Sequence, residues 1–329
     1  MRFTFLLLVL LVSSFEVHAR LRDYVNMERF TSRNLGTWSA GDGDRTWSQI
    51  HCVASSNYND IYSDPPPVVS PPAIHEAYQF QIFDQAPTAG HHFYLDDDNT
   101  NMGNARLSAS FAHRDIKVGT SFETLTDGVY DSHSHTGQFR NCSNGDNSEV
   151  RMTILETELE NARAGRYRGR FRAEAIGGSS GTRVHGRNLV MILNVAEIVR
   201  VSALDNILLG QWSGSGDLSS DETFCVYSNN DSAGYSISLS SPNESGGVFR
   251  LTNGTSTEFV DYQIEYADSV GGVGVPVSTS ALSGTGSNIQ ADCGSADNAR
   301  LSVTVTESDL GLATPDSYSD TVTILVAPL

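Results

Sequence analysis

The sequence predicts an all-β protein made of two immunoglobulin-like β-sandwich domains, and three observations lead to this fold class. Apolar residues alternate with polar ones at a period of two, as in Leu301, Val303 and Val305, which is the pattern of half-buried strands. Turn-forming Gly, Asn, Asp and Ser separate such segments at intervals of about ten residues, as in a β-sandwich. Much of the sequence also occurs twice, so we expect two domains of similar fold.

The first 19 residues have the pattern of a secretion signal. Arg2 provides the positive start, residues 5–12 are a short apolar run, and residues 17–19 (VHA) offer the small side chains of a cleavage site. We therefore expect residues 1–19 to be a signal peptide and the mature chain to be exported. The apolar run is far shorter than the roughly 20 residues that a helix needs to span a bilayer.

An internal duplication sets the domain organisation. Residues 35–41 (LGTWSAG) recur 174 positions later (209 − 35) as residues 209–215 (LGQWSGS). A later block recurs at an offset of 151, at which Tyr167 corresponds to Tyr318. Each copy is therefore expected to form the same kind of sandwich.

The boundary between the copies is expected in or directly after the flexible run of residues 177–181 (GGSSG). This gives an N-terminal domain of residues 20–180 and a C-terminal domain of residues 181–329. The apolar stretch of residues 189–195 either completes the first domain or opens the second.

The four cysteines are expected to form two disulfides, because an even number in an exported chain favours disulfides over metal thiolates. The duplication relates Cys52 to Cys225 and Cys142 to Cys293. It therefore predicts one bridge within each domain, Cys52–Cys142 and Cys225–Cys293.

Composition excludes several classes of function. The formal net charge of −18 argues against nucleic acid as a partner, because phosphate binding needs clustered Lys and Arg. No nucleophile motif such as G-x-S-x-G is present, so we expect neither enzymatic activity nor a cofactor. Five histidines of the first domain have spacings that match no zinc signature, so we expect no metal site; they are His91, His92, His113, His133 and His135.

Five segments of the second domain carry a resemblance to a known family. They are residues 224–227 (FCVY), 234–237 (GYSI), 249–254 (FRLTNG), 262–266 (YQIEY) and 316–324 (DSYSDTVTI). With these segments the chain, over about residues 195–329, resembles the spore coat U family, whose fold is also that of archaic chaperone-usher pilins. The resemblance implies a pilin-type sandwich.

The first domain keeps only part of this pattern. It departs at residues 168–170 (RGR), where the second domain has residues 319–321 (SDT). A pilin-like domain that diverges while keeping its frame resembles a dedicated binding domain, which points to the two-domain tip adhesin of an archaic (Csu-type) pilus. The partners implied are a periplasmic chaperone, an outer-membrane usher and an adjacent pilin subunit, and the implied location is the pilus tip at the cell surface.

The resemblance also implies an incomplete second domain. In chaperone-usher pili each subunit lacks one strand, and the N-terminal extension of the next subunit fills the gap, a form of β-augmentation. The sequence stops at Leu329 directly after its last apolar alternation, and few residues separate the expected cleavage site from the first strand, so we expect a subunit that accepts a strand and donates none. The expected acceptor groove is formed by Val199, Val201, Tyr318, Val322, Ile324 and Val326.

Exposed apolar loops of the first domain are the candidate adhesive surface, since apolar groups left in water usually mark a contact. They are Pro67, Val68, Val69, Pro71 and Ile74 of a proline-rich segment, together with Phe93, Tyr94, Val129 and Tyr130. The favoured function is adhesion to an abiotic surface or a host receptor. The alternative is a secreted structural coat or matrix protein built from the same domains.

Overall fold

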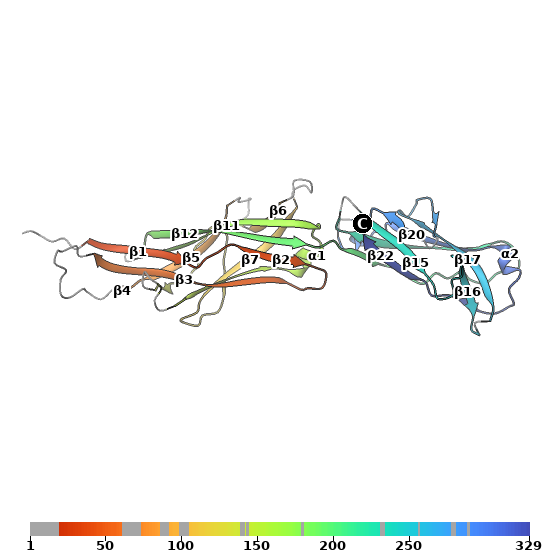
Figure 1. Cartoon of the computed structure of the whole chain (residues 1–329), viewed down its shortest axis with the longest axis horizontal. Coiled ribbons are helices and arrows are strands. Elements are labelled where there is room, and N and C mark those ends of the chain that lie inside the picture. The colour runs from red at the N-terminus through yellow and green to blue at the C-terminus, as the bar shows by residue number, and fades with distance from the viewer. Residues whose placement is uncertain are drawn as a thin grey trace, which may run out of the picture.

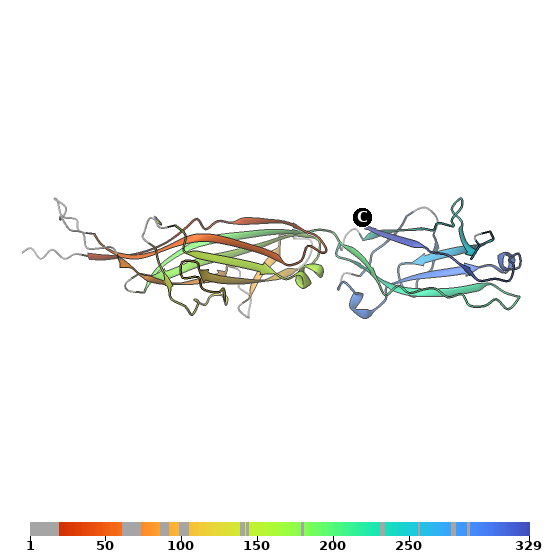
Figure 2. The ribbon, with the colours of Figure 1, turned by 90° about the horizontal axis from the view of Figure 1, so that it is seen from below.

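The computed structural model of the chain describes residues 20–60, 74–85, 92–98, 105–138, 142, 145–178, 181–230, 234–255, 257–277, 281–287 and 290–329. These residues form strands, two short helices and one 3-10 turn, so the prediction of an all-β protein is confirmed. Figure 1 and Figure 2 show two β-rich bodies arranged end to end. None of the helices in the described ranges has the length and apolar character needed to cross a bilayer.

The first domain is built on one curled sheet, in which the strands follow the order β1-β3-β10-β7-β6-β11-β12-β2. The curl brings β1 back beside β12, and aromatic and branched side chains such as Phe80, Phe111 and Phe171 fill the core. The elements are β1 (Arg20–Glu28), β2 (Arg33–Trp38), β3 (Arg45–Asp60), β4 (Ile74–His75), β5 (Ala77–Asp84), β6 (Phe93–Asp97), β7 (Arg106–Asp115), β8 (Glu123–Thr124), β9 (His135–Thr136), β10 (Ser148–Ile154), α1 (Glu156–Glu160), β11 (Gly165–Gly177) and β12 (Arg183–Val195).

Strand β12 completes the first domain. It pairs antiparallel with β11 from Gly177 opposite Arg183 to Gly165 opposite Val195, and it pairs in parallel with β2. Its inward side chains lie in the first core; they are Leu189, Met191, Leu193 and Val195. The run of residues 177–181 therefore connects two paired strands rather than two domains, and the first core extends past residue 180, where we expected the boundary. We propose a boundary between Val195 and Val199.

The second domain is a sandwich of two sheets. One has the order β13-β14-β20-β17-β16-β21 with β18 beside β17, and the other has the order β19-β15-β22. The elements are β13 (Val199–Ser202), β14 (Leu218–Ser228), β15 (Tyr235–Ser240), β16 (Phe249–Asn253), β17 (Phe259–Ala267), β18 (Val275–Pro276), β19 (Leu282–Gly284), η1 (Cys293–Ser295), β20 (Ala299–Val305), α2 (Glu307–Leu310), β21 (Tyr318–Ser319) and β22 (Thr323–Pro328).

The duplication is visible in matching contacts. Both predicted disulfides are present, Cys52–Cys142 and Cys225–Cys293. Gly36 and Gly210 both have a positive φ, +82° and +80°, which a side chain with a Cβ rarely adopts. The following tryptophans, Trp38 and Trp212, each donate an Nε1–H hydrogen bond of 2.8 Å to a glycine carbonyl in the next turn. The repeated sequence thus encodes a repeated turn.

Buried polar contacts join the two domains. The side chain of Asn229, in the second domain, donates through Nδ2 to the carbonyl of Ala162 at 3.1 Å. The backbone carbonyl of Asn229 accepts from the Ala164 N–H at 2.9 Å. The Arg200 guanidinium also pairs with Glu160 at 2.7 Å. The loop after α1 is therefore held against the second domain.

Candidate functional site

The last strand of the second domain has one unpaired edge. β22 pairs antiparallel with β15, from Ser240 opposite Thr323 to Tyr235 opposite Pro328. Within the described ranges no other strand pairs with β22. Its inward residues Ile324 and Val326 are only half-buried, although they pack on the second core. An exposed edge with half-buried apolar side chains is the arrangement that accepts a further strand.

A groove of about 660 Å³ lies beside this edge. One wall is the extended segment of residues 204–210, and the other is formed by residues 318–322 and Ile324. The floor is mostly apolar and consists of Leu239, Leu251, Tyr262, Ile264, Leu301 and Val303. The second core is therefore open to solvent along one side.

The duplication identifies what would fill this groove. At the offset of 174, β2 (residues 33–38) corresponds to residues 207–212, and at the offset of 151 Phe171 and Ala173 of β11 correspond to Val322 and Ile324. In the first domain β12 lies between β2 and β11 and pairs with both. The groove of the second domain therefore occupies the position that β12 fills in the first.

The expected groove residues divide into two sets. Tyr318, Val322 and Ile324 line the groove. Val199, Val201 and Val326 are half-buried and pack against the same core, but they do not line the cavity. The wall residues Ile207 and Leu209 are not among the residues predicted from the sequence, although applying the offset of 174 to β2 identifies both.

The expected adhesive residues lie in separate places. Pro67, Val68, Val69 and Pro71 lie outside the described residues, and Ile74 begins β4, at the end of the first domain far from the second (Figure 1). The expectation that Phe93 belongs to an exposed loop is wrong. Its side chain is 3% exposed and packs on Phe111 and Phe171, because it points inward on β6. It is therefore a core residue and not part of an exposed loop.

Tyr94 and the turn that holds Val129 are both connected to Asp84, at the other end of β5. The Asp84 carboxylate accepts from the Tyr94 N–H at 3.3 Å, and the Asp84 N–H donates to Asp127 at 2.8 Å. Val129 is 49% exposed, and Tyr94 and Tyr130 are half-buried. This makes the turn around Val129 the described part of the candidate adhesive surface.

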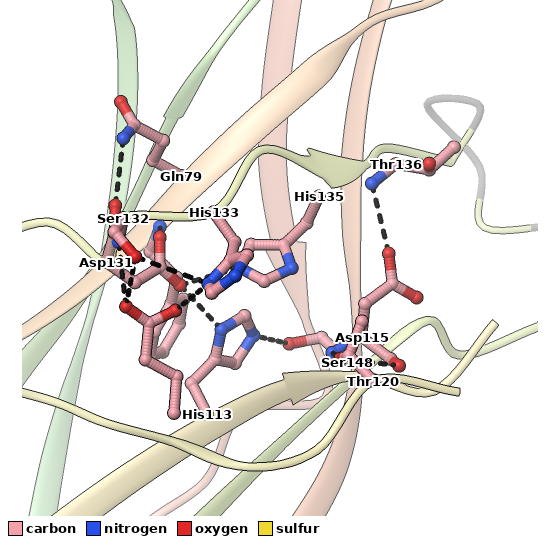
Figure 3. A network of polar contacts seen from close by, with 12 residues as sticks. Gln79, His113, Asp115, Thr120, Asp131, Ser132, His133, His135, Thr136 and Ser148 are labelled. Carbon is pink, nitrogen blue, oxygen red and sulfur yellow. Dashed lines mark hydrogen bonds and ion pairs between the residues drawn. The ribbon is translucent and has the colours of Figure 1, made fainter. Parts of the chain in front are cut away.

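A buried polar cluster lies inside the first domain (Figure 3). His113 Nδ1 and His135 Nε2 lie 2.8 and 2.7 Å from the same oxygen, Oδ2 of Asp131. The other carboxylate oxygen accepts from the Phe80 N–H at 2.9 Å. Of the other histidines singled out in the sequence, His91 lies outside the described residues, and His92 and His133 are exposed.

Burial sets the protonation of this cluster. It lowers the pKa of His113, and it lowers that of the neighbouring His51 to about 3. Burial alone raises the pKa of Asp131, but the hydrogen bonds from His113 and His135 outweigh it and hold that pKa below its usual value. At neutral pH the cluster therefore holds an ionised carboxylate beside neutral His113 and His51.

The cluster also has the connectivity of a hydrolytic triad. Ser148 Oγ lies 2.7 Å from His113 Nε2, and His113 Nδ1 faces Asp131. Ser148 and His113 are both fully buried, so the hydroxyl is not exposed to solvent in this structure.

No protein-family model matches the chain, and no curated protein is similar to it in sequence. Similar solved structures include the CsuC–CsuE chaperone–tip adhesion subunit complex from archaic chaperone-usher Csu pili of Acinetobacter baumannii, at 13% identity and a TM-score of 0.46, with 90% of this chain and 98% of that chain covered. The CupB6 tip adhesin from Pseudomonas aeruginosa is similar at 8% identity and a TM-score of 0.33, with 93% and 94% covered. CfaE, the adhesive subunit of CFA/I fimbria of enterotoxigenic Escherichia coli, also has 8% identity and a TM-score of 0.33, with 91% and 98% covered. At these identities the likeness concerns the fold alone, and membership of the spore coat U family stays a prediction.

Proposed function

We propose that the chain is the tip adhesin of an archaic chaperone-usher pilus. Its C-terminal domain accepts a strand donated by the adjacent pilin subunit, and its N-terminal domain binds an abiotic surface or a host receptor. The observation that carries the proposal is the apolar groove between residues 204–210 and β22, at the position that β12 fills in the first domain. Before assembly, a periplasmic chaperone would cover the same groove and deliver the subunit to the usher.

The first domain supplies a template for the donated strand. β12 runs antiparallel to β11 and parallel to β2, and its inward residues Leu189, Met191 and Leu193 are fully buried. A strand in the groove of the second domain would accordingly run antiparallel to β22 and place an apolar side chain inward at every second position. Burying three or four such side chains contributes about 1.5–3 kcal/mol each.

A fusion tests the acceptor role directly. A copy of residues 178–195, which hold the connection from β11 to β12 and β12 itself, is appended after Leu329, so that it can fold back along β22. We expect a higher Tm for the second domain and slower hydrogen exchange in β22, because the groove becomes filled. The matched control carries Ser in place of Leu189, Met191 and Leu193 within the appended copy only. An equal Tm with the apolar and the serine versions would mean that the second domain needs no further strand.

A substitution in the first domain tests the adhesive role. Val129→Asp is expected to lower attachment of piliated cells. If Val129 is desolvated in the contact, the aspartate must lose its hydration on binding, and the free energy of binding becomes less favourable. Val118→Asp is the matched control, since Val118 is 65% exposed on a different turn. Both changes should alter stability by no more than about 0.5 kcal/mol, as surface substitutions usually do. The double variant Val68→Asp/Val69→Asp tests the proline-rich segment in the same assay. If this variant and Val129→Asp both attach as well as wild type at normal pilus density, these loops are not part of the binding surface.

A further inference from the structure

The buried cluster of His113, Asp131 and His135 has no part in strand acceptance or adhesion as proposed above. We propose that these three residues bind one divalent transition metal ion of the zinc class inside the first domain. One donor atom from each residue lies within 4.8 Å of the others, and all three residues are buried. Two imidazole nitrogens and one carboxylate oxygen are a ligand set that Zn²⁺ accepts in proteins.

The backbone presents the three ligands from separate parts of the fold. His113 lies on β7, His135 begins β9, and Asp131 is fixed between them because its N–H donates to the carbonyl of Phe80 at 2.8 Å. In Figure 3 the two rings and the carboxylate point toward one another from these elements. The ion would be held by His113 Nδ1, His135 Nε2 and Asp131 Oδ2, the three atoms that now face each other.

The surrounding contacts are those that orient metal ligands. The second nitrogen of a metal-bound histidine usually donates to a fixed acceptor, and the free oxygen of a metal-bound carboxylate is usually hydrogen-bonded. His113 Nε2 lies 2.7 Å from Ser148 Oγ, which lies 3.0 Å from His51 Nε2. Asp131 Oδ1 accepts from the Phe80 N–H. These partners leave His113 Nδ1 and Asp131 Oδ2 facing each other, so an ion would replace the hydrogen bond that now joins them.

Tyr78 gives an independent indication of a further group at this place. Its side chain is buried, and its ring centroid lies 5.2 Å from that of His135 and 6.2 Å from that of His113. The hydroxyl lies near Ser148, yet it is a buried polar atom without a hydrogen-bond partner of normal geometry. A buried hydroxyl of this kind requires a partner. A water admitted to the cluster together with the ion would provide one.

Metal analysis of the full chain tests the site. The chain is purified from the periplasm without chelator and is then refolded with Zn²⁺ in excess. We expect about one zinc ion per chain, as a single site of this type binds. His135→Gln and Asp131→Asn should lose the ion. One matched control should keep it: His133→Gln alters an exposed histidine that is paired with Glu123 and lies outside the ligand set.

Cobalt provides a readout that does not depend on the variants. Co²⁺ bound to the wild-type chain should give the intense visible absorption of a four-coordinate site, and Zn²⁺ should displace it and raise the Tm of the first domain. A wild-type chain with both disulfides formed that retains no zinc and shows no such cobalt spectrum would overturn the proposal, and so would equal zinc in His135→Gln and wild type. The three residues would then form a hydrogen-bonded cluster that binds no metal ion.

Discussion

At the scale of single residues, Asn147 and Asn298 show how one amide fixes a strand beside each disulfide. Asn147 accepts from the Val53 N–H at 2.8 Å and donates to the Val53 carbonyl at 3.1 Å. Asn298 makes the same two bonds to Val226, at 2.7 and 2.9 Å. Each valine directly follows a disulfide cysteine, so the amide satisfies a backbone segment that the bridge holds in place.

Replacing these amides should have unequal effects. Asn147 is fully buried, so Asn147→Ala leaves the Val53 N–H without its partner and is expected to cost about 1–3 kcal/mol, while the Val53 carbonyl keeps the hydrogen bond from the Gln138 N–H. Asn298→Ala should cost less, because Asn298 is half-exposed and water can reach the Val226 backbone. Urea unfolding followed separately for each domain measures both values. Equal losses would show that burial is not the cause.

His185 makes the first domain sensitive to acid. Its Nδ1 accepts from the Met27 N–H at 3.0 Å, which only the neutral ring can do at that atom. Burial and the nearby Arg187 and Arg172 lower the pKa of His185 in the fold. The unfolded chain therefore takes up the proton first, so this contribution to stability is complete above pH 6.5 and decreases as the pH falls toward the folded pKa. Because the side chain is partly exposed, the effect should be small.

A variant isolates this effect from that of the other histidines. His185→Gln keeps a carbonyl acceptor for the Met27 N–H and removes the titration. Between pH 7.5 and pH 5, the Tm of wild type should fall further than that of His185→Gln. Parallel curves for the two proteins would show that His185 does not carry the pH dependence.

The sequence revealed some residue roles and concealed others. Both disulfides followed from the duplication, because a repeated frame relates the cysteines directly. The cluster of His113, Asp131 and His135 could not be inferred, since it forms only when the chain between β7 and β9 folds back over the sheet. Phe93 was misassigned because inward and outward positions of a strand look alike until its register is known.

At the scale of elements, β12 and β22 show which part of the fold the sequence leaves open. The alternation in residues 189–195 identifies a strand, but the same alternation fits a strand that closes the preceding domain or one that opens the next. The choice depends on pairing with β11 and β2, and β2 lies more than 150 residues earlier in the chain. Local sequence carries no signal for such a non-local pairing.

Matched truncations should separate a filled groove from an open one. Leu193→Ala removes a fully buried side chain of β12 and is expected to cost about 2–5 kcal/mol. Ile324→Ala removes a half-buried side chain at the open groove, so it should cost only about 1 kcal/mol in the free chain. With the donor segment fused after Leu329, the loss of unfolding free energy caused by Ile324→Ala should rise toward that caused by Leu193→Ala. Urea unfolding of wild type, the two single variants, the fusion and the fusion that carries Ile324→Ala measures these costs. An equal cost of Ile324→Ala with and without the donor segment would contradict a donor strand at this edge.

At the scale of the whole molecule, the joint between the domains decides whether the first domain keeps a fixed direction relative to the second. The core of the first domain continues across the joint, since Tyr227 and the disulfide of Cys225 and Cys293 belong to the same cluster of buried residues. The Tyr227 hydroxyl also donates to the Glu160 carbonyl at 3.2 Å. Apolar contact and buried hydrogen bonds together favour one fixed arrangement of the domains over free hinge motion.

Asn229 is the residue on which this joint most depends. It is 1% exposed, and its Nδ2 donates to the carbonyls of Ala162 and Ala196 while Oδ1 accepts from the Ile198 N–H at 2.7 Å. Asn229→Ala leaves these three backbone groups without the amide, and the least costly way to hydrate them is to open the joint. We therefore expect the variant to keep both domains folded but to sample several relative orientations.

Small-angle scattering and residual dipolar couplings measure this directly. Wild type should fit one alignment tensor for both domains, and Asn229→Ala should need two tensors and show a broader distribution of distances. Asn230→Ala is the matched control, because the neighbouring side chain bonds Glu197 at the exposed rim of the joint and its loss should leave one tensor. If a rigid joint serves adhesion, the Asn229 variant should also detach sooner under flow while its Tm and pilus density stay close to wild type. A single tensor in Asn229→Ala would mean that the apolar contact around Tyr227 holds the domains without the amide.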